Sequence, residues 1–76
     1  MIKEHDRVIL KEDLPDQGLV AGDIGTVLHI YRDGMGYAVE FISLKGDTVA
    51  VVTLKSVQIR HARLHEIPHA RVLVSV

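Results

Sequence analysis

The chain contains no cysteine and no tryptophan, and it has only one phenylalanine and two prolines among 76 residues. Without cysteine, neither a disulfide nor a thiolate metal site can stabilise the fold, so a secreted disulfide-rich scaffold is excluded. A domain of this length hides only about 60% of the surface that its unfolded chain exposes. We therefore expect a single small domain that depends on packing or on self-association for its stability.

Long apolar segments are also lacking. Residues 1–7 are charged without the apolar core of a signal peptide, and no apolar run approaches the roughly 18 residues of a membrane helix. We expect a cytoplasmic protein that does not enter the membrane. The net charge is −1, but residues 1–54 are acidic, whereas residues 55–76 carry four Lys or Arg against one Glu.

Valine and isoleucine are abundant, because they supply 18 of the 76 residues in short runs separated by glycine, aspartate and proline. This pattern is typical of strands. The expected strands are 6–11, 24–32, 37–43, a fourth that ends at Leu54, and a fifth that follows a short helical turn within 55–60. The predicted fold class is all-β: a small SH3-like barrel over residues 1–60, followed by a C-terminal extension, 61–76, that holds a linker and an extra strand.

Two four-residue turns set the expected register of the central strands. If residues 33–36 and 44–47 are entirely turn, Ile30 lies opposite Val39, and Val39 lies opposite Val52. Because side chains alternate between faces, this register places in the core Leu28, Ile30, Val39, Phe41, Ala50, Val52 and Leu54. The opposite face then carries Val27, His29, Tyr31, Ile42, Val49 and Val51 around Glu40. That face is unexpectedly apolar for one in contact with water.

The sequence therefore predicts an interaction surface. Its candidate residues are Val27, Tyr31, Ile42, Val49 and Val51, joined by Val72 and Val74 of the apolar run 71–76. An apolar strand with no partner in its own domain tends to pair with another chain. Two arrangements stay open: the run folds back over this face of its own barrel and buries it, or copies self-associate, with or without exchange of the run.

Several motifs resemble a known family. They are the turn 22–27 (GDIGTV), the Asp33-Gly34 turn, the Gly36-Tyr37 pair, Val39-Glu40-Phe41 and Thr53-Leu54. Together they resemble a bacterial family of short proteins described only as a domain of unknown function, over about residues 3–60. The resemblance implies an SH3-like barrel and no activity. The tail from His61 onward departs from the family pattern.

Catalytic and metal chemistry finds little support. Residues 65–69 spell H-E-x-x-H, but Pro68 breaks the helix that would bring both histidines onto one face around zinc. His61, His65 and His69 recur every four residues and leave metal binding open, although a surface histidine is by default solvated. No serine lies in a nucleophile motif, so we expect no enzyme, no catalytic residues and no cofactor.

Two binding functions remain. The turn 22–27 also resembles the KOW motif of nucleic-acid-binding barrels, but the barrel is acidic, and only Lys55, Arg60, Arg63 and Arg71 could contact phosphates. A proline-rich ligand would need an aromatic groove that the chain lacks. We expect a non-enzymatic interaction module that forms a homo-oligomer or binds another protein. The alternative is a nucleic-acid-binding protein that uses the basic tail.

Overall fold

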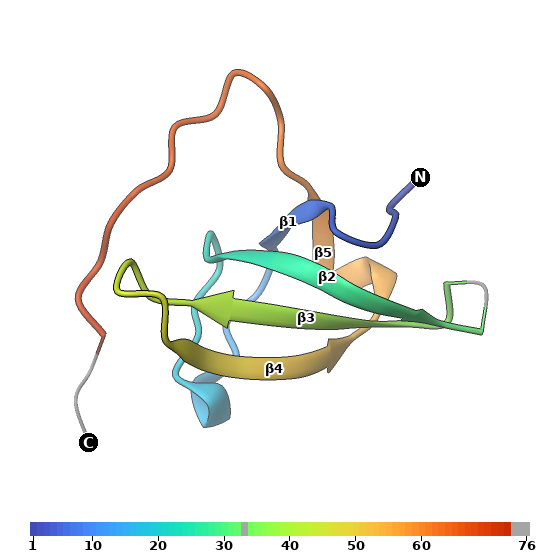
Figure 1. Cartoon of the computed structure of the whole chain (residues 1–76), viewed down its shortest axis with the longest axis horizontal. Coiled ribbons are helices and arrows are strands. Elements are labelled where there is room, and N and C mark those ends of the chain that lie inside the picture. The colour runs from blue at the N-terminus through green and yellow to red at the C-terminus, as the bar shows by residue number, and fades with distance from the viewer. Residues whose placement is uncertain (33, 74–76) are drawn as a thin grey trace.

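The computed structural model describes residues 1–32 and 34–73, and within them the chain is an all-β fold (Figure 1). Its five strands are β1 (Arg7–Leu10), β2 (Ile24–Tyr31), β3 (Gly36–Ile42), β4 (Thr48–Leu54) and β5 (Ile59–His61). Two short 3-10 turns, η1 (Pro15–Gln17) and η2 (Ser56–Gln58), lie in the connections. All strand pairs are antiparallel, in the order β4-β3-β2-β1-β5. The predicted all-β class is confirmed, and this order is consistent with a small SH3-like barrel.

The hydrophobic core lies on the inner face of the curved sheet. Its buried side chains are Val8, Leu10, Leu19, Val27, Tyr37, Val39, Phe41, Leu54 and Ile59. Each fully buried aliphatic side chain contributes about 1.5–3 kcal/mol relative to exposure. Among the predicted core residues, Val39, Phe41 and Leu54 are buried, and Ile30, Ala50 and Val52 pack against the core from its edge. The prediction for Leu28 is wrong, because 42% of this residue is exposed.

A bulge in β2 explains the error at Leu28. The hairpin turn begins one residue earlier than predicted: Arg32 adopts a positive φ of 43°, and Tyr31 pairs with Gly36. Further along, the register shifts between Val27 and His29, so Leu28 is the extra residue. A shift by one residue moves every preceding side chain to the other face. Val27 therefore lies opposite Val39 in the core, and not on the outer face where the sequence placed it.

A second bulge lies where β3 meets β4. The pairs of Phe41 with Ala50 and of Val39 with Val52 are those predicted. The register then shifts, and Ile42 pairs with Thr48 instead of Val49. Val49 is the extra residue, and its side chain packs partly buried against the core. Its predicted position on the outer face is therefore wrong for the same physical reason as that of Val27.

Gly25 is the residue in β2 that most needs to be glycine. A Cβ atom at this position would lie 2.4 Å from Cγ1 of Val39 and 3.1 Å from the carbonyl oxygen of Glu40. Non-bonded carbon atoms pack at about 3.5–4.0 Å. The close approach of β2 to β3 at this point therefore excludes any side chain.

The C-terminal segment does not form the predicted extra strand in the part of it that the structure describes. Residues 62–73, which we call the tail, leave β5 and run back around the outside of the barrel (Figure 1). They contain neither helix nor strand. Val74 lies outside the described residues. The tail returns to the barrel near the starts of β2 and β4.

Candidate interaction surfaces

The predicted interface residues do not form one patch. Tyr31, Ile42 and Val51 are exposed by 42%, 57% and 54%, and Val72 is almost fully exposed. Tyr31 pairs with Gly36, whereas Val51 pairs with Glu40, four residues further along β3. At about 3.3 Å per residue these two side chains lie roughly 13 Å apart along the sheet. With Val27 in the core, the continuous apolar stripe is absent.

Polar groups also interrupt the outer face of the sheet. The carboxylate of Glu40 accepts a hydrogen bond from the hydroxyl of Thr48 at 2.7 Å. The rings of His29 and Tyr31 meet edge to face at 4.6 Å, and His29 lies 3.5 Å from a carboxylate oxygen of Glu4. This face is therefore a mixed surface of a common kind.

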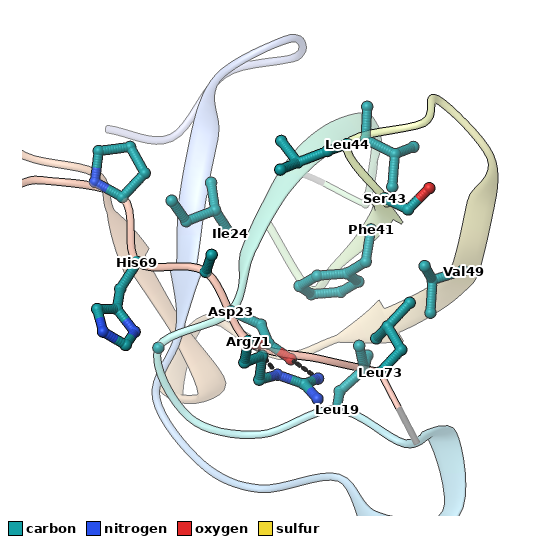
Figure 2. Close-up of a pocket in the computed structure, with 14 residues that line it drawn as sticks. Leu19, Asp23, Ile24, Phe41, Ser43, Leu44, Val49, His69, Arg71 and Leu73 are labelled. Atoms are coloured by element: carbon teal, nitrogen blue, oxygen red, sulfur yellow. Dashed lines mark hydrogen bonds and ion pairs between the residues drawn. The ribbon is translucent and has the colours of Figure 1, made fainter. Parts of the chain in front are cut away.

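A hollow lies instead between the barrel and the tail (Figure 2). On the barrel side its walls are Leu19, Ile24, Phe41, Ile42, Leu44 and Val49, and we call this hollow the tail groove. Pro68, His69, Ala70, Arg71 and Leu73 form the opposite wall. The space between the walls is about 530 Å³. Of the predicted interface residues, Ile42 and Val49 belong to this groove.

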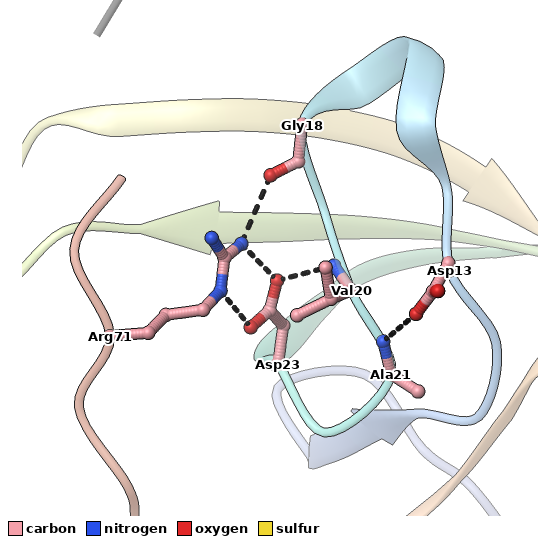
Figure 3. Close-up of polar contacts among 6 residues, drawn as sticks. All are labelled: Asp13, Gly18, Val20, Ala21, Asp23 and Arg71. Carbon is pink, nitrogen blue, oxygen red and sulfur yellow. Dashed lines mark hydrogen bonds and ion pairs between the residues drawn. The ribbon is translucent and has the colours of Figure 1, made fainter. Parts of the chain in front are cut away.

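An ion pair fastens the far end of the tail to the barrel. The guanidinium of Arg71 donates two hydrogen bonds to the carboxylate of Asp23, at 2.8 and 2.6 Å, and a third to the carbonyl oxygen of Gly18 at 3.0 Å (Figure 3). Only 29% of the Arg71 side chain and 17% of the Asp23 side chain are exposed. Bidentate pairs of this kind are among the stronger and more specific polar contacts.

The pKa of Asp23 reflects this partner. Partial burial raises the pKa of the carboxyl, but the Arg71 guanidinium and the N–H of Val20 together lower it further, so the net pKa lies below the usual value. The same pair raises the pKa of Arg71, with the hydrogen bond to Asp23 as the largest cause. Asp23 is therefore ionised at neutral pH in its pair with Arg71.

The loop between β1 and β2 also holds Asp23 in place, through contacts that do not involve the tail. Asp23 accepts a hydrogen bond from the N–H of Val20 at 2.9 Å, and Asp13 accepts one from Ala21 at 2.9 Å (Figure 3). Gly22 adopts a φ of 98°, which glycine tolerates without strain, and its N–H donates to the carbonyl of Leu10. Asp23 is thus part of the barrel and is preorganised for a ligand.

A second ion pair stabilises the start of the tail. Arg60 donates to both carboxylate oxygens of Glu66, at 2.8 and 2.6 Å, and the N–H of Arg63 donates to Glu66 at 2.7 Å. These contacts lower the pKa of Glu66 to about 2, with the hydrogen bonds from Arg60 as the largest cause. Beyond Glu66 the side chains are exposed until the tail groove is reached.

The histidines are dispersed. Residues 65–69 form no helix, so the geometry that H-E-x-x-H requires is not present in them. His61 lies 3.1 Å from a carboxylate oxygen of Asp6, away from His69, which lines the tail groove. Within residues 1–32 and 34–73, no three His, Asp or Glu side chains are grouped as metal ligands.

The sequence alone does not identify Asp23 as a functional residue, because GDIGTV is typical of a fold signature. It indicates Arg71 only as one cation of the alternative nucleic-acid patch. The signal that could have joined them is the isolated arginine in front of an apolar run, since such a cation needs a carboxylate where the run docks.

No helix among the described residues is long and apolar enough to cross a membrane. Comparison with curated proteins gave no match, and comparison with solved structures gave none either. Comparison with protein families matches residues 4–61 to one described as Domain of unknown function (DUF4926). The match covers all five strands and the barrel side of the tail groove, and it ends before the tail. The chain therefore belongs to the DUF4926 family.

Proposed function

We propose that the chain is a non-enzymatic protein-interaction module that self-associates by exchanging its tail between copies. In this arrangement the tail of each copy lies in the tail groove of the other. The observation that carries the proposal is the bidentate pair of Arg71 with Asp23, which fastens the far end of the tail to the barrel.

Exchange requires no new kind of contact. Each hydrogen bond that holds Arg71 to its own barrel can form with the identical Asp23 and Gly18 of a second copy. The connector 62–70 has exposed side chains except at Ala62, so its rerouting to a neighbour would sacrifice little packing. The five strands and the core stay as they are, because none of them includes the tail.

Association would also cover apolar surface that a single chain leaves in water. Ile42, Leu44 and Val72 are all strongly exposed, and Ile42 and Leu44 form one rim of the tail groove. Burial of apolar surface stabilises by about 25 cal/mol per Å². On a domain as small as this one, that gain is a useful addition to marginal stability.

The molar mass in solution tests the proposal. Size-exclusion chromatography with multi-angle light scattering, at tens of micromolar chain, should give twice the 8.4 kDa of one chain. Replacing Arg71 with Asp sets two carboxylates against each other, and we expect the mass to fall to that of a monomer. Asp13→Asn is the matched control, because Asp13 braces the same loop through Ala21 and does not contact the tail.

Two results would contradict the proposal. One is a wild-type monomer at tens of micromolar. The other is a dimer whose mass is unchanged by Arg71→Asp, since this would place the interface elsewhere. Circular dichroism on each variant separates loss of association from loss of folding.

The alternative, nucleic-acid binding by the tail, has less support. Of its four candidate cations, Arg60 and Arg71 are each engaged bidentately by a carboxylate. A cation held in this way must give up its partner before it can neutralise a phosphate. If the alternative is right, affinity for RNA or DNA should fall steeply as salt is raised.

A further inference from the structure

The tail fills only part of its groove. About 530 Å³ of space remains between the tail and the barrel. Pockets that bind small ligands typically have volumes of about 300–1,000 Å³. Most of the side chains that line this space are apolar, and the buried ring of Phe41 lies among them (Figure 2). Leu73 is the largest apolar side chain that the tail contributes beside Pro68 and Ala70, and it remains 41% exposed.

We propose that the tail groove is a recognition site for an extended segment of another protein, with an arginine followed two residues later by an aromatic residue. This inference rests on the proposed role of the tail groove as the interaction site. The chain's own Arg71 and Leu73 show the spacing: the arginine reaches Asp23, and the residue two positions on enters the apolar space. A larger ring at that second position would fill what Leu73 leaves open.

The anchor selects arginine over lysine. Asp23 receives two parallel hydrogen bonds from Nε and Nη2, and the carbonyl oxygen of Gly18 accepts another from Nη2. A guanidinium presents donors in a flat fork that matches a carboxylate, whereas an ammonium acts as a single point of charge. The three contacts therefore make a site for one cation type.

The apolar half selects a large, rigid side chain. Arginine and aromatic residues are the residues most often found at binding hot spots, where a pocket removes them from water. An aromatic ring also brings a large apolar area with little loss of conformational freedom. The groove therefore combines the two features of such a site, a preorganised carboxylate and an unfilled apolar space.

The family match includes the barrel side of the tail groove but not the tail that lies in it. The groove lies within the matched residues 4–61, and its resident occupant lies outside them. The tail is then a built-in competitor for the partner segment. A protein whose tail is released should bind such a segment more tightly, since it no longer has to displace its own.

Fluorescence anisotropy with labelled peptides tests the inference on the full chain. The Arg71→Ala variant releases the tail and keeps Asp23. The probe is the pentapeptide His-Ala-Arg-Val-Leu, which repeats residues 69–73, and a second probe carries phenylalanine in place of its leucine. We expect the phenylalanine peptide to bind roughly three- to tenfold more tightly than the leucine peptide. A peptide with glutamate in place of arginine should bind at least about tenfold more weakly.

Further outcomes decide the matter. Adding Asp23→Asn to the Arg71→Ala chain should lower its affinity for the phenylalanine peptide to its affinity for the glutamate peptide. Adding Asp13→Asn should leave the affinity for the phenylalanine peptide unchanged. Equal affinity for the leucine and phenylalanine peptides, or for the arginine and glutamate peptides, would overturn the inference. Peptide binding by the Arg71→Ala chain, together with a wild-type chain that is a monomer in solution, would refute tail exchange and leave this recognition site standing. A wild-type dimer that Arg71→Asp converts to a monomer, without any peptide binding, would uphold the exchange and refute the recognition site.

Discussion

Replacing Val27 and Leu28 one at a time tests the β2 bulge on which the face assignments depend. Val27 is fully buried, whereas 42% of its neighbour Leu28 is exposed. Val27→Ala removes two methyl groups, which cost about 0.8 kcal/mol each in lost burial. The cavity left behind adds to this, so we expect a total of about 2–3 kcal/mol. Leu28→Ala removes more atoms, yet it should cost less than about 1 kcal/mol, because its side chain is partly in water already.

Thermal and urea denaturation of the two variants measure this difference. For a domain of this size, each kcal/mol lowers the melting temperature by about 4–8 °C, so Val27→Ala should lower it by roughly 10–20 °C. Leu28→Ala should lower it by only a few degrees. The refuting result is the reverse order, with the larger loss at Leu28, because a regular β2 without the bulge would bury Leu28 and expose Val27.

Two further predictions concern the barrel and its acid stability. Gly25→Ala should destabilise the chain by about 1–3 kcal/mol in urea denaturation, because its Cβ would lie 2.4 Å from Cγ1 of Val39. Gly36→Ala should be tolerated, because its Cβ would meet nothing nearer than 3.5 Å. Equal losses of stability in the two variants would contradict the close approach of the strands. The pKa of Glu66 is lowered from 4.5 to about 2, so the stability it contributes is complete above about pH 5 and is lost as the pH falls towards 2. Glu66→Gln should flatten this part of the pH profile of urea denaturation, and an unchanged slope would show that Arg60 does not hold the carboxylate in solution.

Much of the barrel was predictable from the sequence. The short valine- and isoleucine-rich runs separated by Gly, Asp and Pro gave the strands to within a residue or two, because alternation and turn chemistry are local. The turn 44–47 led to the correct pairs of Val39 with Val52 and of Phe41 with Ala50. Local rules were sufficient wherever a strand ran without interruption.

The bulges were not predictable in the same way. A bulge depends on how two strands fit over the core, and the residues that form it, Leu28 and Val49, are ordinary strand residues in sequence. Each bulge moved one predicted interface residue inward, Val27 in the first case and Val49 in the second. The predicted apolar outer face therefore resulted from a register that lacked these two bulges.

The tail groove was not predictable because it joins distant segments. Asp23 and Arg71 are 48 positions apart, and neither has a motif that names the other. The sequence did leave open that residues 71–76 fold back over the outer face, whereas Arg71 and Leu73 line the tail groove and leave Tyr31 and Val51 exposed. Where the tail docks, and through which carboxylate, depends on how the loop before β2 presents Asp23.

A charge-exchange experiment tests tail exchange most directly. Asp23→Arg and Arg71→Asp each place like charges together when a tail meets its own groove. In an equimolar mixture, the Arg71 tail of the first variant meets the Asp23 groove of the second, and the reversed pair forms at the other groove. We predict that each variant alone is a monomer by light scattering and that the mixture has twice the 8.4 kDa mass of one chain. A mixture that stays monomeric, while the wild type is a dimer, would contradict tail exchange.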